Sequence, residues 1–227
     1  MHRVLLTRAS GQNEELAGLL RANGIEPVIV PVLEVTLDTT ELKKVVASRK
    51  FDWVVVTSPN GARSVKGLVN GATRLAAVGN HTAAVLDRVP DLIAEVTNAE
   101  GLVDVFPESS ASNGAVLVCR SDLADETVAD GLRSKGWDVE VVITYRVAAR
   151  DPKVIQSEIE SAGHLDAIVL ASGSAARALP QAPAMPKVVC IGPKTEDVAR
   201  EVGLKPCGTA ATQDAQGLLE AVLRAVR

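Results

Sequence analysis

The sequence is poor in aromatic residues and in basic charge, and both shortages argue against nucleic-acid binding. Aromatic side chains make up 2% of the 227 residues, and Tyr145 is the single tyrosine. Stacking platforms for single-stranded nucleic acid are therefore lacking. The net charge of −4 also argues against nonspecific nucleic-acid binding, which normally needs a basic face. We expect no nucleic-acid partner, and any anionic ligand must be held by locally placed donors.

Cysteine, histidine and long apolar runs are scarce as well. The three cysteines and three histidines show no metal-ligand spacing, so we expect no metal site and reduced cysteines packed as small hydrophobic residues. No stretch approaches the roughly 18 apolar residues of a membrane span. The first residues contain too short an apolar run for a secretory signal. These features predict a cytoplasmic protein without a membrane partner.

The sequence does contain an internal repeat with a period of about 112 to 116 residues. FDWVVVTSPNGAR (Phe51 to Arg63) matches LDAIVLASGSAAR (Leu165 to Arg177), and LAAVGNHTAAVL (Leu75 to Leu86) matches VVCIGPKTEDVA (Val188 to Ala199). The opening of the chain, from Val4 onward, matches the segment that begins at Val116. A period this long corresponds to a whole domain. We therefore expect two similar lobes with a ligand cleft between them.

Strand-like and helix-like segments alternate along the chain. Nearly continuous Val, Leu and Ile is typical of strands that are covered on both faces of a parallel sheet. A helix is predicted over Gly11 to Gly24, with Gly24 as its C-terminal stop. The pattern predicts an α/β fold of two parallel sheets flanked by helices. Predicted strands are Arg3 to Thr7, Pro27 to Val35, Asp52 to Thr57, Arg74 to Val78, Ala115 to Cys119, Asp138 to Val147, Asp166 to Ala171 and Lys187 to Ile191.

Polar turns follow several of these strands, at the sheet edge where ligands usually bind. The turns begin at Ser58, Gly79 and Gly192. Glycine permits close backbone approach, and Ser, Asn or Thr can cap a helix while other N–H groups stay free for an anion. Each turn alone is explained better as an ordinary strand-to-helix turn with an N-cap. Their presence in both copies favours a shared anion-binding cleft, although duplication could preserve caps for folding alone.

Six segments together resemble the uroporphyrinogen-III synthase family across essentially the full length. They are VLLTR, FDWVVVTSPNGAR, AAVGNHTA, VTNAEGL, VVITYRV and CIGPKTEDVA, in this order. The resemblance implies a lyase without a cofactor, which closes hydroxymethylbilane to uroporphyrinogen III with inversion of ring D and loss of water. Loss of the ring A hydroxyl gives an azafulvene, and attack by ring D gives a spiro intermediate that opens and recloses. It also implies the flavodoxin-like form of the α/β fold.

The family tyrosine corresponds to Tyr145, which we expect to donate a proton to the departing hydroxyl, since a phenol is protonated at neutral pH. The alternative role of Tyr145 is that of a half-buried strand residue. Positioning of ring D is expected to be the main catalytic effect. Further residues are expected to bind the eight substrate carboxylates, although helix capping or surface exposure explains each of them individually: Arg8, Ser58, Asn60, Arg63, Gly79, Thr82, Arg146, Ser172, Gly192, Lys194 and Thr195.

The resemblance further implies that the two copies exchange their first strand and helix. One lobe is then 1–33 with 148–227, the other is 37–144, and the crossings are 34–36 and 145–147. We expect a monomer that receives its substrate by transient hand-over from hydroxymethylbilane synthase. Two other classes stay open: a two-lobed solute-binding protein, which ordinarily needs an export signal, and a non-catalytic protein that binds a tetrapyrrole or a small anion.

Overall fold

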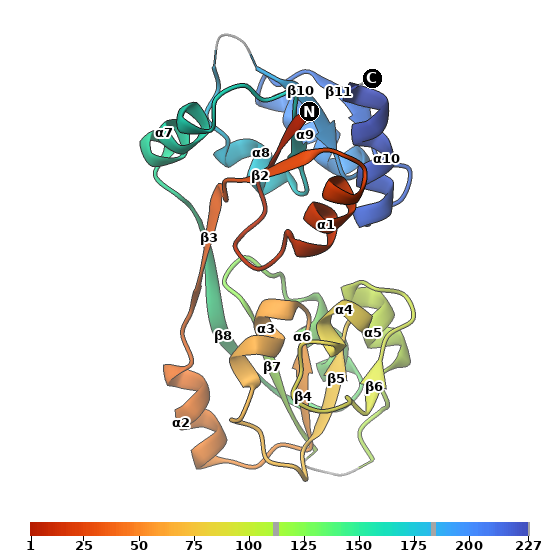
Figure 1. Ribbon diagram of the computed structural model, residues 1–227. Helices are drawn as coiled ribbons and strands as arrows, with labels where there is room; N and C mark the ends of the chain where they lie inside the picture. Colours follow the sequence, from red (N-terminus) through yellow and green to blue (C-terminus); the bar gives the residue numbers. More distant parts are fainter. Residues whose placement is uncertain (111–113, 183–184, 227) are drawn as a thin grey trace. The chain divides into compact units, whose positions relative to one another are not determined.

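The computed structural model describes residues 1–110, 114–182 and 185–226. The chain divides into two compact units (Figure 1): unit 1 is Met1–Glu34 with Ala148–Arg227, and unit 2 is Val35–Val147. The crossings expected at 34–36 and 145–147 lie within two strands, β3 (Leu33–Leu37) and β8 (Asp138–Ala149). In the described residues, no helix is long and apolar enough to cross a membrane.

Unit 1 contains a five-stranded sheet in which all neighbouring strands are parallel. The spatial order is β11-β10-β9-β1-β2. The interior strands are nearly uniform runs of Val, Leu, Ile and Ala because helices cover both of their faces. The strands are β1 (Arg3–Leu6), β2 (Glu26–Ile29), β9 (Ala167–Leu170), β10 (Lys187–Cys190) and β11 (Pro206–Thr209).

Five helices enclose the unit 1 sheet and form one hydrophobic core on each face. Helices α1 (Glu14–Ala22) and α10 (Ala215–Val226) pack on the face that contains Val4 and Val169. The opposite face, with Leu5 and Ile168, is covered by α7 (Pro152–Ala162), α8 (Gly173–Ala178) and α9 (Pro193–Glu201). The predicted first helix is thus confirmed in its central part, and Gly24 adopts the left-handed φ of +72° just beyond its end.

Unit 2 is built in the same way. Its sheet has the order β3-β8-β7-β4-β5-β6, and the neighbours from β8 to β6 are parallel. The other strands are β4 (Trp53–Val56), β5 (Arg74–Ala77), β6 (Leu92–Ile93) and β7 (Ala115–Ser121). One face is covered by α2 (Thr40–Ser48), α3 (Pro59–Val65) and α4 (Asn80–Ala83), and the other by α5 (Ala99–Val105) and α6 (Thr127–Ser134).

The matching strands of the two sheets lie in the same spatial order, but the chain visits them in a different sequence. Matching the repeated segments pairs β1 with β7, β2 with β8, β9 with β4, β10 with β5 and β11 with β6. Apart from β3, which adds a sixth strand beside β8 in unit 2, both sheets then have the order 2-1-3-4-5 of flavodoxin-like folds. Unit 1 begins at the first strand of this order, whereas unit 2 begins with β3 and continues at the third strand of the order. The predicted α/β fold of two similar parallel-sheet lobes is therefore confirmed.

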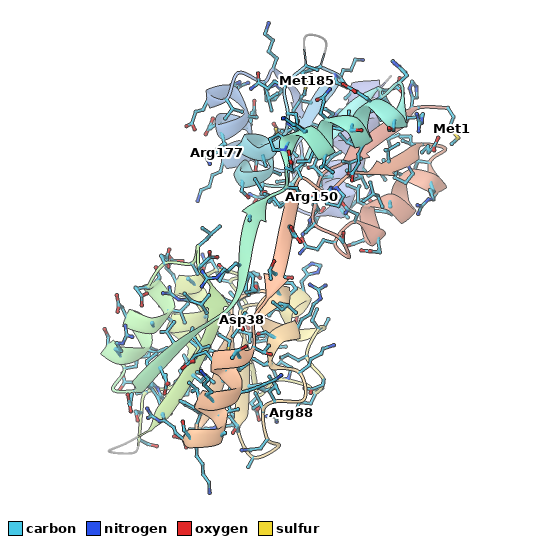
Figure 2. The ribbon with its side chains drawn as sticks, turned by 90° about the vertical axis from the view of Figure 1, so that its left-hand side faces the viewer. Met1, Asp38, Arg88, Arg150, Arg177 and Met185 are labelled. Carbon is cyan, nitrogen blue, oxygen red and sulfur yellow. The ribbon has the colours of Figure 1, made fainter. Side chains whose placement is uncertain are left out.

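The repeat also explains the two strands that connect the units. Asp38 N–H donates to the Thr144 carbonyl at 2.9 Å, and Arg150 N–H donates to the Val32 carbonyl at 3.0 Å. Asp38 and Arg150 are 112 positions apart in the sequence, and so are Val32 and Thr144. The two hydrogen bonds are therefore equivalent in the repeat. Figure 2 labels Asp38 and Arg150 at the two ends of this strand pair.

The single strand predicted over Pro27 to Val35 was wrong, because the structure divides it into β2 and β3. Val30 and Val32 still donate to the end of β1, but Pro31 between them has no N–H to donate. The chain leaves the unit 1 sheet there and pairs with β8 instead. The short edge strands β6 and β11 were not predicted.

Candidate functional site

The candidate site of unit 2 lies at the carboxyl edge of its sheet, between the parallel strands β7 and β4, where the strand order changes direction. From β7 the chain continues outward to β8 on one side, while β4 on the other side leads to β5 and β6. Ligands of open α/β sheets bind at such a switch point. Two predicted residues meet here: the Tyr145 hydroxyl lies 2.7 Å from the Ser58 hydroxyl.

Tyr145 reaches this edge because the pairing of β7 with β8 shifts by one residue. Arg120 pairs with Ile143, and the next pair is Ser121 with Tyr145, so Thr144 is the extra residue. Regular alternation would turn one of two successive residues outward. Instead, Thr144 and Tyr145 are both buried, with exposed fractions of 0% and 6%. A bulge of this kind re-aims a side chain, and here it brings the phenol toward α3.

Ser58 is the N-cap residue of α3. Its extended backbone (φ −159°, ψ 160°) lets the side-chain oxygen accept the Gly61 N–H at 3.1 Å. Gly61 suits this position because a Cβ atom there would lie 3.0 Å from the Cys119 carbonyl oxygen, a close contact. The cap and the end of β7 thereby fix the position of the hydroxyl that contacts Tyr145.

This arrangement leaves the phenol proton available for transfer. The Ser58 oxygen accepts one hydrogen bond from Gly61 and still has its own O–H to donate. If Ser58 donates to Tyr145, the tyrosine O–H can point to a bound ligand, and the same donor stabilises the phenolate formed when the proton leaves. Tyr145 is therefore suited to act as a general acid, and Ser58 to support it.

The other candidates in the turns of unit 2 are a hydrogen-bonded pair, a buried threonine and a closely packed glycine. Arg63 donates to Asn60 at 2.7 Å, so the structure brings these two side chains of α3 together. Thr82 is buried within α4, and its hydroxyl has no hydrogen-bond partner in the described parts of the chain. Gly79 precedes α4, and a Cβ atom there would lie 2.6 Å from the Thr97 side chain. Tight packing is thus one reason for this glycine.

Arg146 follows Tyr145 but is exposed. Its guanidinium lies 3.6 Å from the Asp122 carboxylate, which makes a loose ion pair at the surface. Such exposed pairs contribute little to stability. Arg146 therefore remains available to an anionic ligand.

Unit 1 presents the equivalent turns at its own carboxyl edge. Ser172 caps α8 by accepting the Ala175 N–H at 3.1 Å, as Ser58 does in α3, and its second neighbour is Ser174 at 3.0 Å. Gly192 lies in the turn before α9, where a Cβ atom would lie 3.0 Å from the Gln213 side chain. The two turns repeat the capping and packing of unit 2, although the tyrosine is missing.

Three further unit 1 candidates have polar groups without partners. Arg8 and Lys194 are exposed, and neither side chain donates a hydrogen bond or forms an ion pair in the ranges that the structure describes. Thr195 is 6% exposed within α9, and its hydroxyl is likewise unpaired there. By contrast Arg120, the counterpart of Arg8, donates to the Ala124 carbonyl at 2.7 Å and pairs with Glu126.

The structure offers neither a reactive thiol nor a cluster of metal ligands at these edges. Burial raises the pKa of the Cys119 thiol to about 12, so it stays protonated at neutral pH. Among residues 1–110, 114–182 and 185–226, no three His, Cys, Asp or Glu side chains gather in a way that could hold a metal ion. The expectation that all cysteines are packed inside was wrong for Cys207, which is exposed.

Two residues of this edge were missed by the sequence reasoning. Ser121 ends β7 opposite Tyr145, and Thr144 is the extra residue of the shifted pairing. A signal was available, because the residues at the matching positions of the other copy are Ala9 and Val32.

The fold and the site define an α/β protein of two flavodoxin-like units, with a hydrogen-bonded tyrosine and serine at the switch point of one sheet. The model of the family "Uroporphyrinogen-III synthase HemD" matches residues 14–220. The chain belongs to the uroporphyrinogen-III synthase family.

Relatives of known name agree with this assignment. The chain is 29% identical to the chloroplastic uroporphyrinogen-III synthase of Oryza sativa subsp. japonica, with 99% of this chain and 80% of that protein covered. It is 28% identical to the uroporphyrinogen-III synthase of Synechococcus elongatus, with 77% and 72% covered. The crystal structure of the Helicobacter pylori synthetase covers 99% of both chains with a TM-score of 0.66 at 16% identity, which supports the shared fold.

Proposed function

We propose that this chain is a uroporphyrinogen-III synthase, a cyclising lyase of tetrapyrrole biosynthesis that converts hydroxymethylbilane to uroporphyrinogen III. The match of the family model to residues 14–220 supports the assignment. The single structural observation that carries the chemistry is the 2.7 Å contact between Tyr145 and Ser58. The reaction removes water and rearranges carbon–carbon bonds, so it is proposed to proceed without a cofactor.

Tyr145 is proposed to start the reaction as the general acid. Its proton joins the ring A hydroxyl oxygen while the carbon–oxygen bond breaks toward that oxygen, and water leaves. The ring A pyrrole nitrogen supplies electrons to the carbon that has lost the hydroxyl. When this nitrogen also loses its N–H proton, the azafulvene is formed. Ser58 stabilises the phenolate until it is protonated again. General acid catalysis of this kind contributes about 100- to 10,000-fold.

Ring D must then attack through its substituted carbon, and the protein is proposed to favour this geometry by holding the carboxylates. The polar groups without partners suit this role in unit 1, and the Asn60–Arg63 pair and Thr82 suit it in unit 2. Charge-assisted hydrogen bonds to carboxylates are stronger than neutral ones. The proposed carboxylate-binding set is Arg8, Asn60, Arg63, Thr82, Arg146, Ser172, Lys194 and Thr195, with backbone N–H groups near Gly79 and Gly192.

We also propose that 1–33 with 148–227 and 37–144 behave as separate lobes that move through 34–36 and 145–147. The few residues that cross between the units support this proposal, because domain motion is the default where connections are thin. A monomeric state, a cytoplasmic location and hand-over of substrate from hydroxymethylbilane synthase stay predictions; the rice relative is named chloroplastic.

The test supplies hydroxymethylbilane to the purified protein, oxidises the product and separates isomers I and III. We expect isomer III to form faster than isomer I forms in a protein-free control. Isomer I alone, at the protein-free rate, would overturn the proposal and favour a protein that binds tetrapyrroles without converting them.

A further inference from the structure

Three buried residues of unit 2 carry hydroxyl groups where the matching residues of unit 1 are apolar. Ser121, Thr144 and Tyr145 each lie 112 residues after their counterparts, which are Ala9, Val32 and Leu33 in that order. The structure supports the alignment, because Val32 and Thr144 accept the two equivalent hydrogen bonds of the strand pair. The two copies therefore differ in polarity at one corner of the sheet, next to the candidate acid.

Ser121 occupies a defined position in this corner. Leu117 and Cys119 of β7 belong to the core beneath α3, and alternation along a strand places Ser121 on the same face. It pairs in register with Tyr145. Because β7 lies between β8 and β4, the tyrosine must extend across β7 to reach Ser58. Ser121 thus stands on the strand that the phenol crosses.

The hydroxyl of Ser121 has no other use in the fold. The residue Ser121 is 8% exposed, and its hydroxyl makes no hydrogen bond within the described residues. Unlike the Thr144 hydroxyl, the Ser121 hydroxyl is not closed off from the surface, so a ligand can reach it. The matching residue of the other copy, Ala9, is buried and apolar, so the repeat itself does not require a hydroxyl at this position. A ligand that reaches this corner would satisfy the hydroxyl.

We infer that Ser121 is a further substrate-contacting residue, whose hydroxyl donates a hydrogen bond to the oxygen that leaves ring A. This inference rests on the proposed function. The oxygen that receives the Tyr145 proton must lie about 2.6–3.2 Å from the phenol, and Ser121 borders that position. When the carbon–oxygen bond breaks, the electron pair stays on the oxygen and the Tyr145 proton converts it to water. Ser121 stabilises the charge that develops there and keeps its own proton.

The experiment replaces Ser121 by the residue of the other copy, in Ser121→Ala, and measures isomer III formation from hydroxymethylbilane. We expect kcat to fall about tenfold, which corresponds to about 1.4 kcal/mol, while KM changes less than twofold. Ser134→Ala is the matched control, because Ser134 is exposed on α6 and donates to the Asp130 carbonyl. The thermal midpoint of each variant shows whether the fold is intact.

Thr144→Val separates contact with the substrate from packing around Tyr145. The Thr144 hydroxyl is fully buried and cannot touch a ligand, so this variant should keep kcat within twofold. Equal losses in Thr144→Val and Ser121→Ala would overturn the inference, as would unchanged kcat in folded Ser121→Ala. A rise in KM alone would instead assign Ser121 to a carboxylate and contradict the contact with the leaving oxygen. If the wild-type protein forms no isomer III, it is the proposed function that fails.

Discussion

Replacing Ser58 by alanine should remove two interactions in one step. The variant loses the cap of α3, where the Gly61 N–H donates at 3.1 Å, and the 2.7 Å hydrogen bond to Tyr145. A lost N-cap costs about 1 kcal/mol. A lost hydrogen bond between partly buried hydroxyls costs about another 1 kcal/mol. We therefore expect Ser58→Ala to lower the free energy of unfolding of unit 2 by about 2 kcal/mol.

Asn98→Ala provides the matched control in the same unit. Asn98 caps α5 by accepting the Gly101 N–H at 2.7 Å, and its side chain makes no bond to a tyrosine. This variant should lose about 1 kcal/mol, the contribution of the cap alone. Both tryptophans, Trp53 and Trp137, belong to unit 2, so tryptophan fluorescence during urea unfolding reports on this unit.

The difference between the two variants measures the bond to Tyr145. Equal losses of free energy in Ser58→Ala and Asn98→Ala would show that the hydrogen bond to Tyr145 does not stabilise unit 2. A double-mutant cycle of Ser58→Ala with Tyr145→Phe should give a coupling of about 1 kcal/mol. Ser58→Ala should also slow isomer III formation, whereas Asn98→Ala should not.

Three further predictions concern stability and thiol chemistry. Hydrogen bonds from the Arg3 N–H and His2 lower the pKa of Asp166. The carboxylate therefore stabilises the fold at pH values above the ordinary pKa of an aspartate. This stability is lost as the pH falls through the lowered pKa. Asp166→Asn should cost about 1 kcal/mol at pH 7 in circular-dichroism melts, and the difference from wild type should shrink below about pH 4; a constant difference would contradict this. Thr144→Val should raise stability by about 1 kcal/mol, because it removes an unpaired buried hydroxyl; destabilisation in urea unfolding would show that Thr144 has a partner. Burial raises the pKa of Cys119 to about 12 and of Cys190 to about 11. Iodoacetamide at pH 8 should therefore label Cys207 alone in the native protein, which peptide mass spectrometry would show. Early labelling of Cys119 would contradict its burial.

Much of the fold was predictable because the repeat and the apolar runs are strong signals. Strands such as Trp53–Val56 consist wholly of buried residues, and their pattern indicates a parallel sheet directly. The edge strands were not predictable in the same way. Leu92–Ile93 is too short to show a pattern, and Pro206–Thr209 contains proline and glycine, which are depleted in strands. The break at Pro31 arises because proline has no N–H to donate. This absence matters only once the segment pairs with β1, and the sequence does not show that pairing.

The site was predictable residue by residue, but its geometry was not. Tyr145 and Ser58 were candidates for separate reasons, and their separation of 87 positions in the sequence hides their contact. That contact depends on the shifted register at Thr144, for which no local sequence signal exists. The repeated Asp52 and Asp166, by contrast, are explained by folding alone. Each accepts a backbone N–H from the neighbouring strand at 2.8 Å, from Ala115 and Arg3 respectively.

The rate at which Tyr145→Phe forms isomer III shows whether the Tyr145 hydroxyl is the proton donor. Phenylalanine keeps the ring and removes only the hydroxyl, so the thermal midpoint should stay within a few degrees of wild type. We predict that isomer III forms at least about 100-fold more slowly, as expected when a general acid is removed, with isomer I becoming the main product. A folded Tyr145→Phe protein that forms isomer III at the wild-type rate would contradict the role of Tyr145 as the proton donor.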